Sequence, residues 1–350
     1  MSSYLESFNT HSEYESAKST LDKPNVSYCK MEDEVHFNPI TPLDEYFTFE
    51  IISGGTIVWK ASSTATTLAT ISYSLDEGET WTNITSSTSG TSFNVSDGDK
   101  VMFKGDNTSY GATTSAYNTF SGSTATFNVR GNIMSLITSQ GYSSNETLTN
   151  GFTFTGLIRY TKVVDAKHLL LPATTLANYC YYNLFQGCAY LTTAPELPST
   201  TLFDSCYNGM FDNCTRLTVA PELPATTLAS YCYNYMFVAC RSLTTAPELP
   251  ATTLANYCYS RMFQGCTSLT AAPELSATTL KIQCYSNMFQ NCTSLNSITC
   301  LATNISATNC LKDWVSGVAS SGTFTKAASM TSWPSGNNGI PNGWTVVDAA

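Results

Sequence analysis

The stretch from Pro224 to Leu249 reads P-A-T-T-L-A-S-Y-C-Y-N-Y-M-F-V-A-C-R-S-L-T-T-A-P-E-L, and the same pattern returns every 26 residues. Five such units run from residue 172 to residue 301. A fixed period of this length is the mark of a repeat architecture, in which one unit cannot bury its apolar side chains alone. The sequence therefore predicts that successive units stack on one another and share a core.

Within one unit, the apolar side chains are spaced as on one face of a short helix. Cys232, Met236, Phe237 and Cys240 stand at i, i+4, i+5 and i+8. The segment that follows contains Pro247, which cannot donate to a sheet ladder, so we expect it to be extended and poorly paired. The sequence thus predicts one helix and one extended segment per unit, stacked as a solenoid.

The segments on both sides of the five units predict caps for the ends of this stack. Residues 138–171 contain the apolar pair Leu157-Ile158, which fits the repeated Met-Phe pair, and predict a degenerate capping repeat. Residues 302–350 carry Trp314 and Val315 at the same positions and predict a second capping repeat with a turn-rich lid. Exposed ends of stacked repeats require such caps.

The repeated motif Y-x-x-M-F-x-x-C-x-x-L, which begins at Tyr259 in the fourth unit, resembles the BspA-type leucine-rich repeats. This resemblance implies a curved solenoid used in surface binding and adhesion, of a kind found in gut Bacteroidales and in the phages that infect them. Pro221-Glu222 stands where the family usually has apolar strand residues. The resemblance therefore does not extend to a regular sheet.

Cysteine recurs twice in each unit, and we expect these residues to be free, buried thiols. Two cysteines eight residues apart on a helix lie ~12 Å apart along its axis, whereas a disulfide needs Cα atoms within ~7 Å. There is no Cys-x-x-Cys pair, and the histidines His11, His36 and His168 are scattered, which argues against zinc. Buried cysteine packs as a small apolar side chain.

Residues 1–44 form a polar segment that we interpret as an attachment segment. Thr10 and Glu13 form a capping box, which predicts a short helix, and alternating residues on either side of Glu32-Asp33 predict two strands. The stretches P-N-V-S-Y-C and E-V-H-F-N-P are similar to N-termini of structural proteins of Bacteroidales phages. That similarity implies attachment to a larger assembly; the alternative is a helix and strand added to the next domain.

Residues 45–137 predict a small Ig-like β-sandwich, so that the predicted fold class of the chain is α+β. Six segments favour strands: 47–51, 56–59, 70–73, 92–95, 101–103 and 125–129. Between them, Ser74 to Trp81 reads S-L-D-E-G-E-T-W and resembles the Asp-box of sialidase-like propellers. Those boxes are structural hairpins, and one copy favours a hairpin turn with Trp81 packed on the sheet.

Two ladders of side chains recur at the repeat period and are candidate binding residues. The tyrosines beside the first cysteine either cover the core or stack on sugar rings; they are Tyr181, Tyr207, Tyr233, Tyr259 and Tyr285. The glutamates form either a solvated acidic stripe or a weak Ca²⁺ site; they are Glu196, Glu222, Glu248 and Glu274.

The composition excludes several classes of function. Charged residues are only 12% of the chain, the net charge is -10, and no run of basic residues suggests nucleic-acid binding. No stretch is long and apolar enough to span a membrane, residues 1–16 do not resemble a secretion signal, and no catalytic or metal-binding motif occurs. We expect no cofactor and no catalytic residue.

The sequence therefore predicts a non-enzymatic structural and binding protein. The expected setting is the surface of a phage virion, as a head fibre, decoration or tail-associated protein. The expected partners are other virion proteins or a second copy bound through the N-terminal segment, with host-surface glycans or proteins as further ligands. A bacterial cell-surface adhesin is the alternative, and a carbohydrate-active enzyme is a weaker one that depends on the single Asp-box.

Overall fold

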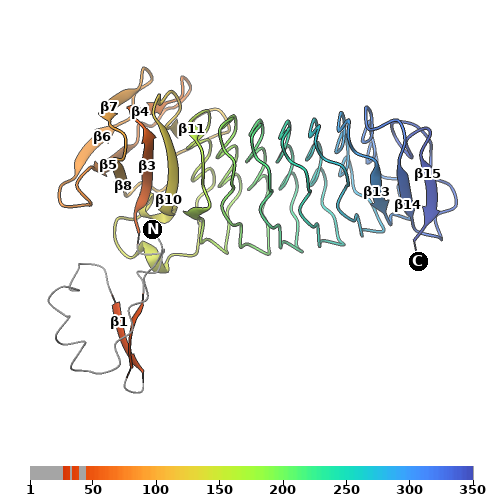
Figure 1. The fold of residues 1–350 in the computed structure, drawn as a ribbon, viewed down its shortest axis with the longest axis horizontal. Coiled ribbons are helices and arrows are strands. Elements are labelled where there is room, and N and C mark those ends of the chain that lie inside the picture. The colour runs from red at the N-terminus through yellow and green to blue at the C-terminus, as the bar shows by residue number, and fades with distance from the viewer. Residues whose placement is uncertain (1–26, 32–33, 39–44, 350) are drawn as a thin grey trace.

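The computed structural model describes residues 27–31, 34–38 and 45–349, so the helix predicted from Thr10 and Glu13 lies outside the described residues. In the described part there is no α-helix, and the only helical segments are two short 3-10 helices, η2 (Ile133–Leu136) and η3 (Tyr142–Ser144). Beyond the first strand pair, a β-domain is followed by a row of stacked coils and a small sheet at the C-terminal end (Figure 1). The predicted α+β fold class is therefore wrong.

The strand pair expected around Glu32-Asp33 is confirmed. Strand β1 (Ser27–Met31) runs antiparallel to β2 (Glu34–Asn38), with Ser27 opposite Asn38 and Met31 opposite Glu34. The alternating pattern predicts these strands at residues 25–29 and 34–37, so that each observed bound is within two residues of the predicted one.

The β-domain contains eight strands in two sheets. They are β3 (Phe47–Ser53), β4 (Gly55–Ala61), β5 (Thr70–Ser74), β6 (Thr82–Thr85), β7 (Thr91–Val95), β8 (Lys100–Lys104), β9 (Asn118–Thr119) and β10 (Thr126–Asn132). The larger sheet has the order β11-β10-β3-β8-β5-β6, in which β11 (Lys162–Val163) follows the β-domain in the sequence. The smaller sheet has the order β7-β4-β9. All six predicted segments are strands, but an Ig-like sandwich is not shown.

Aromatic side chains fill the core of the β-domain. Phe49 stacks on Phe127 with ring centroids 4.0 Å apart and meets Phe103 and Phe120 edge-on at 4.9 Å. Phe49, Phe103 and Phe127 come from three neighbouring strands and lie on the same face of the larger sheet, because every second side chain of a strand points to the same side. Trp59 is also fully buried, and its indole N–H donates to the carbonyl oxygen of Ala69 at 2.8 Å.

The larger sheet continues past the β-domain into the first coil, which is formed by residues 138–171. Strand β10 pairs in parallel with β11 (Lys162–Val163) and with β12 (His168–Leu170), both of which belong to the segment predicted as a degenerate repeat. The amide of Phe120 also donates to the carbonyl oxygen of Leu157 at 2.8 Å. The β-domain and the coils are thus joined by backbone hydrogen bonds.

In the coils, a ribbon of overlapping turns takes the place of the predicted helix. In this ribbon, the backbone amide of every second residue donates to a carbonyl oxygen of the same turn, as the amide of Tyr182 does to Tyr179. The residues between them donate to the next coil: Tyr181 to Cys206 at 3.0 Å and Asn183 to Asn208 at 2.9 Å. Half of the ribbon's amides therefore bind each coil to the next.

A left-handed residue recurs every fourth position and keeps the ribbon from becoming a helix. Tyr179, Asn183 and Gly187 have φ angles of 60°, 53° and 73°, and the corresponding residues of the later coils also have positive φ. A right-handed helix cannot continue through such a residue.

The helix prediction, and with it the leucine-rich-repeat type of solenoid, is wrong for a definite reason. A four-residue period of turns returns Cys232, Met236 and Cys240 to the same side of the chain, as the 3.6-residue period of a helix also does. Hydrophobic spacing over so short a segment does not separate the two structures. The sheets in the described residues lie at the two ends of the row of coils and do not form a solenoid.

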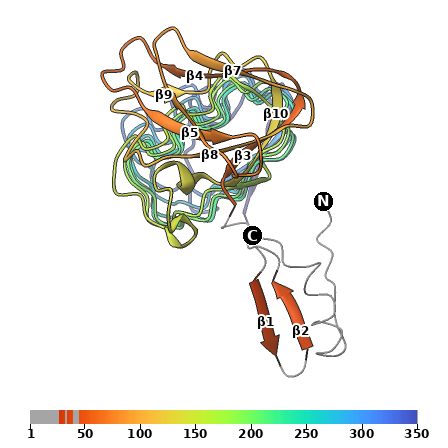
Figure 2. The same ribbon diagram turned by 90° about the vertical axis from the view of Figure 1, so that its left-hand side faces the viewer.

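The segment after the ribbon is extended and poorly paired, as Pro247 and its counterparts predict. Neighbouring coils meet there only through isolated parallel bridges, such as Thr193 with Val219 and Val219 with Thr245. Seen along the long axis, the coils lie over one another (Figure 2).

Two ladders of aromatic rings run through the shared core. One has ring centroids 5.7 to 6.3 Å apart and consists of Tyr110, Phe154, Tyr181, Tyr207, Tyr233, Tyr259, Tyr285 and Trp314. The other has centroids 5.6 to 5.8 Å apart and consists of Phe185, Phe211, Phe237, Phe263 and Phe289. These distances are those of offset stacking. The core is therefore continuous from the β-domain to the last coil.

A three-stranded parallel sheet and two tryptophans close the C-terminal end. The strands are β13 (Ser297–Cys300), β14 (Thr323–Lys326) and β15 (Thr345–Asp348). Trp314 is fully buried, and its indole N–H donates to the carbonyl oxygen of Gly339 at 2.8 Å. Trp344, in the lid that the sequence predicts, is also buried, and its indole N–H donates to the carbonyl oxygen of Ala319 at 2.8 Å.

The tyrosine hydroxyls of the first ladder give a test of the core. The hydroxyl of Tyr207 is buried with no acceptor among the described residues, whereas that of Tyr110 donates to the carbonyl oxygen of Leu136 at 2.6 Å. We expect Tyr207→Phe to leave the free energy of unfolding unchanged or raise it by about 1 kcal/mol, and Tyr110→Phe to lower it by about 1 kcal/mol. Urea unfolding followed by circular dichroism measures both; equal losses in the two variants would contradict this account of the ladder.

Candidate functional site

The tyrosine ladder predicted as a candidate binding surface is part of the core. Its side chains are at most 1% exposed: Tyr181, Tyr207, Tyr233, Tyr259 and Tyr285. No sugar can stack on them, because each ring lies between the rings of its neighbours. Of the two alternatives that the sequence left open, core cover is therefore confirmed, and stacking on sugar rings is wrong. The tyrosine two positions earlier in the third unit, Tyr231, does reach the surface and is 37% exposed.

The glutamates of the second ladder are all exposed: Glu196, Glu222, Glu248 and Glu274. Glu196 and Glu222 border a hollow of about 350 Å³ whose other walls are mainly prolines, among them Pro195 and Pro221. No group of three or more His, Cys, Asp or Glu side chains in the described residues is arranged to hold a metal ion. The ladder is thus a solvated acidic stripe in this structure.

The cysteines of the coils are free and buried, so the packing role predicted for them is confirmed. Burial raises the pKa of Cys188 to about 11 and that of Cys180 to about 12. The second thiol of each unit also donates to a carbonyl oxygen of the preceding coil, as Cys240 does to Phe211 at 3.2 Å. Such thiols are poor nucleophiles, because the thiolate is the reactive form.

These pKa values predict how the thiols react. Burial also raises the pKa of Cys258 to about 12. At pH 9, we expect iodoacetamide to leave Cys180, Cys188 and Cys258 unmodified in the folded protein and to label them fully in urea, as mass spectrometry of peptides would show. Above about pH 8.5, the pKa of a cysteine in an unfolded chain, the folded protein keeps thiol protons that the unfolded chain loses. Stability should therefore fall as the pH rises from about 8.5 toward 12. Rapid labelling of Cys258 in the folded protein would contradict this assignment.

The Asp-box forms the predicted hairpin turn, between β5 and β6. Asp76 accepts hydrogen bonds from the amide of Thr80 at 2.9 Å and from the hydroxyl of Ser74 at 2.7 Å. Hydrogen bonds from the Thr80 hydroxyl and amide and from Ser74 lower the pKa of Asp76 to about 2. Trp81 donates its indole N–H to the carbonyl oxygen of Gly78 at 2.9 Å. Both oxygens of Asp76 are engaged in the turn.

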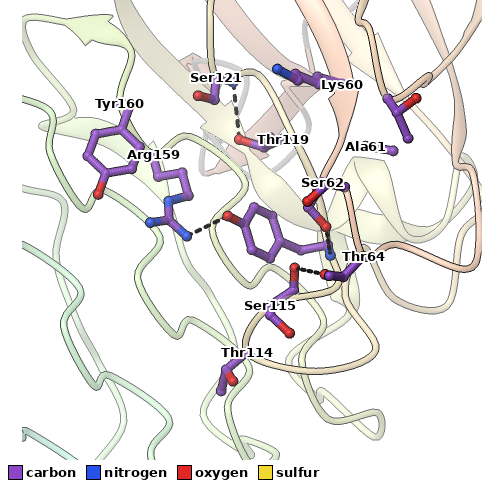
Figure 3. A pocket seen from close by; sticks show the side chains of 13 residues that line it. Lys60, Ala61, Ser62, Thr64, Thr114, Ser115, Thr119, Ser121, Arg159 and Tyr160 are labelled. Atoms are coloured by element: carbon purple, nitrogen blue, oxygen red, sulfur yellow. Dashed lines mark hydrogen bonds between the residues drawn. The ribbon is translucent and has the colours of Figure 1, made fainter.

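A pocket of about 520 Å³ lies where the β-domain meets the first coil (Figure 3). The β-domain contributes strand ends and loops, and the first coil contributes Arg159 and Tyr160. The lining residues are Lys60, Ala61, Ser62, Ser63, Thr64, Thr88, Thr114, Ser115, Tyr117, Thr119, Ser121, Arg159 and Tyr160. This volume is within the usual range of small-molecule sites.

Backbone pairing holds the β-domain side of the pocket in place. Lys60 of β4 pairs with Thr119 of β9, and Ser62 and Tyr117 exchange two hydrogen bonds at 2.9 and 3.1 Å. The hydroxyl of Thr64 donates to the carbonyl oxygen of Ser115 at 2.6 Å. The loop that carries these hydroxyl groups is therefore fixed on a strand.

Arg159 connects the two sides of the pocket. One of its terminal N–H groups donates to the hydroxyl of Tyr117 at 2.7 Å, and the other terminal nitrogen donates to the side-chain oxygen of Gln186. The guanidinium carbon lies 5.1 Å from the ring centroid of Tyr117 and 4.7 Å from that of Tyr160. Its Nε atom is enclosed by protein and has no acceptor among the described residues.

The network continues from Arg159 into the first two repeats. Gln186 donates from its side-chain nitrogen to Asp212 at 2.7 Å, and burial raises the pKa of Asp212. The pocket is therefore coupled by side-chain hydrogen bonds to the coils below it.

Tyr160 forms an exposed wall of the pocket and rests against Gly187. Its side chain is 55% exposed. A Cβ atom on Gly187 would lie 2.1 Å from the Cδ1 atom of Tyr160, and Gly187 has a φ of +73°. A glycine is thus required at residue 187 for the ring to lie where it does.

The sequence did not single out this pocket. Its hydroxyl-rich loops, Ser62-Ser63-Thr64 and Thr113-Thr114-Ser115, and the adjacent Arg159-Tyr160 pair are visible in the sequence. These residues come together because β9 pairs with β4 and Phe120 hydrogen-bonds to the first coil. Such long-range contacts cannot be predicted from a local sequence pattern.

Comparison of the chain with family models, with curated proteins and with solved structures gave no match. The described residues also contain no helix that could cross a membrane.

Gly187 and Gly265 occupy the same place in two repeats and give a matched test of the pocket wall. Gly265 has a φ of +75°, but a Cβ there would meet only Ala239, at 3.7 Å. We expect Gly265→Ala to cost about 1 kcal/mol of stability from backbone strain alone. Gly187→Ala should cost more and should displace Tyr160, which changes the NMR signals of Arg159 and Tyr160. Equal effects of the two substitutions on stability and on these signals would contradict the predicted clash.

Proposed function

We propose that this chain is a non-enzymatic structural and binding protein of the surface of a phage virion. The observation that carries the proposal is the continuous core of the coils, with one ring ladder from Tyr110 to Trp314 and backbone hydrogen bonds between successive coils. Such a stack suits a stiff spacer that holds one end of the molecule away from the other.

The chemistry of the described residues favours binding over catalysis. The thiols that recur in the coils are buried and hold their protons, and Asp76 is engaged by the residues of its own hairpin. The carbohydrate-active enzyme is therefore disfavoured as an alternative. The pocket at the first coil offers hydroxyl groups, two cations and an exposed aromatic ring, which are groups that recognise a ligand.

The phage setting rests on the similarity of residues 1–44 to N-termini of phage structural proteins. In this proposal, that segment attaches the chain to other virion proteins or to a second copy, and the coils carry the pocket outward. The repeat motif favours a bacterial cell-surface adhesin as the second candidate, because surface adhesion is what the BspA-type resemblance implies.

Detection in purified particles tests the virion assignment. An antibody against the coils should label purified virions in immunogold electron microscopy, and mass spectrometry should find peptides of the chain in a ratio to the major capsid protein that stays constant through a density gradient. Peptides only in the host envelope fraction would favour the adhesin and contradict the virion proposal.

Deletion of residues 1–44 tests the attachment step. Phage that encode the shortened chain should produce particles without it, while the soluble shortened protein keeps the cooperative thermal unfolding transition of the full chain. Normal incorporation of the shortened chain would contradict attachment through this segment.

A further inference from the structure

We infer that the pocket between the β-domain and the first coil binds a sugar residue that carries a carboxylate, as part of an acidic surface glycan. This inference deepens the proposed function, since the glycan would belong to the surface that the protein contacts. It is carried by the charge, the hydroxyl groups and the exposed ring that meet in the pocket (Figure 3).

The charge of the pocket is opposite to that of the chain. The whole chain has 26 acidic and 16 basic residues, yet the lining contains Lys60 and Arg159 and no aspartate or glutamate. Neither cation forms an ion pair with a carboxylate in the described part of the chain. A concave site that is lined by cations and has no anions attracts an anionic ligand and repels a cationic one.

The hydroxyl groups of the pocket fit a sugar better than a simple anion. Eight of the thirteen lining residues are serine or threonine. A hydroxyl both donates and accepts, as a sugar hydroxyl does. An inorganic anion accepts hydrogen bonds from only a few donors and would not fill about 520 Å³.

The exposed ring of Tyr160 supplies an apolar face for the sugar ring. Its side chain is 55% exposed although it is backed by Gly187 and by the guanidinium of Arg159. Tyrosine offers an apolar ring and a polar hydroxyl together, which suits a ligand with both kinds of surface.

The binding experiment uses the full-length protein and pairs of probes that differ only in charge. Isothermal titration and saturation-transfer NMR would compare 3′-sialyllactose with lactose, and trigalacturonate with its methyl ester. We expect at least one acidic probe to bind about tenfold or more tightly than its neutral partner, as removal of a charge-assisted hydrogen bond predicts. Its affinity should fall as salt is raised.

Substitutions in the pocket locate the binding. Lys60→Gln and Tyr160→Asn should each weaken the acidic probe about tenfold; asparagine tolerates the positive φ of residue 160, so that the backbone is kept. The control is the pair of Arg216 over Tyr190, with 5.1 Å between the guanidinium and the ring centroid, which lies outside the pocket. Arg216→Gln and Tyr190→Asn should leave binding unchanged.

Several results would overturn the inference. They are equal affinity for acidic and neutral probes, no binding of either acidic probe, inorganic phosphate that binds as tightly as the acidic sugar, or unchanged affinity in well-folded Lys60→Gln and Tyr160→Asn proteins. The virion assignment is tested on particles and does not depend on these results. A chain that is found in virions but binds no acidic sugar would retain the proposed function and lose this ligand.

Discussion

The hydrogen bond from one coil to the next is the interaction on which the rest of this structure depends. A residue such as Asn183, held at positive φ, turns alternate amides toward the neighbouring coil, where Asn208 accepts. Because hydrogen bonds join each coil to the next along the whole ribbon of turns, equivalent aromatic residues of successive coils lie over one another and form the ladders. The buried thiols fill the space beside the rings and donate to carbonyl oxygens that the ribbon leaves within reach.

The sequence predicted the units, their stacking and their buried side chains, because a 26-residue period with apolar positions in register reports directly on a shared core. It failed on the backbone between the cysteines. The positions of Asn213, Asn287 and Asn291, with glycine at equivalent positions of other coils, were the signal for left-handed residues. The spacing of Met and Phe predicts a helix, although turns that repeat every four residues place side chains in the same way.

The candidate site could not be predicted for a different reason. Lys60, Tyr117 and Arg159 are far apart in the sequence and meet only because β9 pairs with β4 while Phe120 bonds to the first coil. The tyrosines chosen from the sequence were periodic, and periodicity selects residues that every coil needs for its core. A ligand site in a repeat protein is more readily found where the period breaks, and the first coil is such a place.

The length of the stack can change without change to its two ends. Every coil presents the same hydrogen-bonding face to the next one, so that whole units can be gained or lost without change to either end. Each unit would extend the molecule by about 5 Å, the spacing of paired backbones. The pocket and the terminal sheet would be unaffected, and the reach of the protein could vary between related chains through unequal exchange of repeats in the gene.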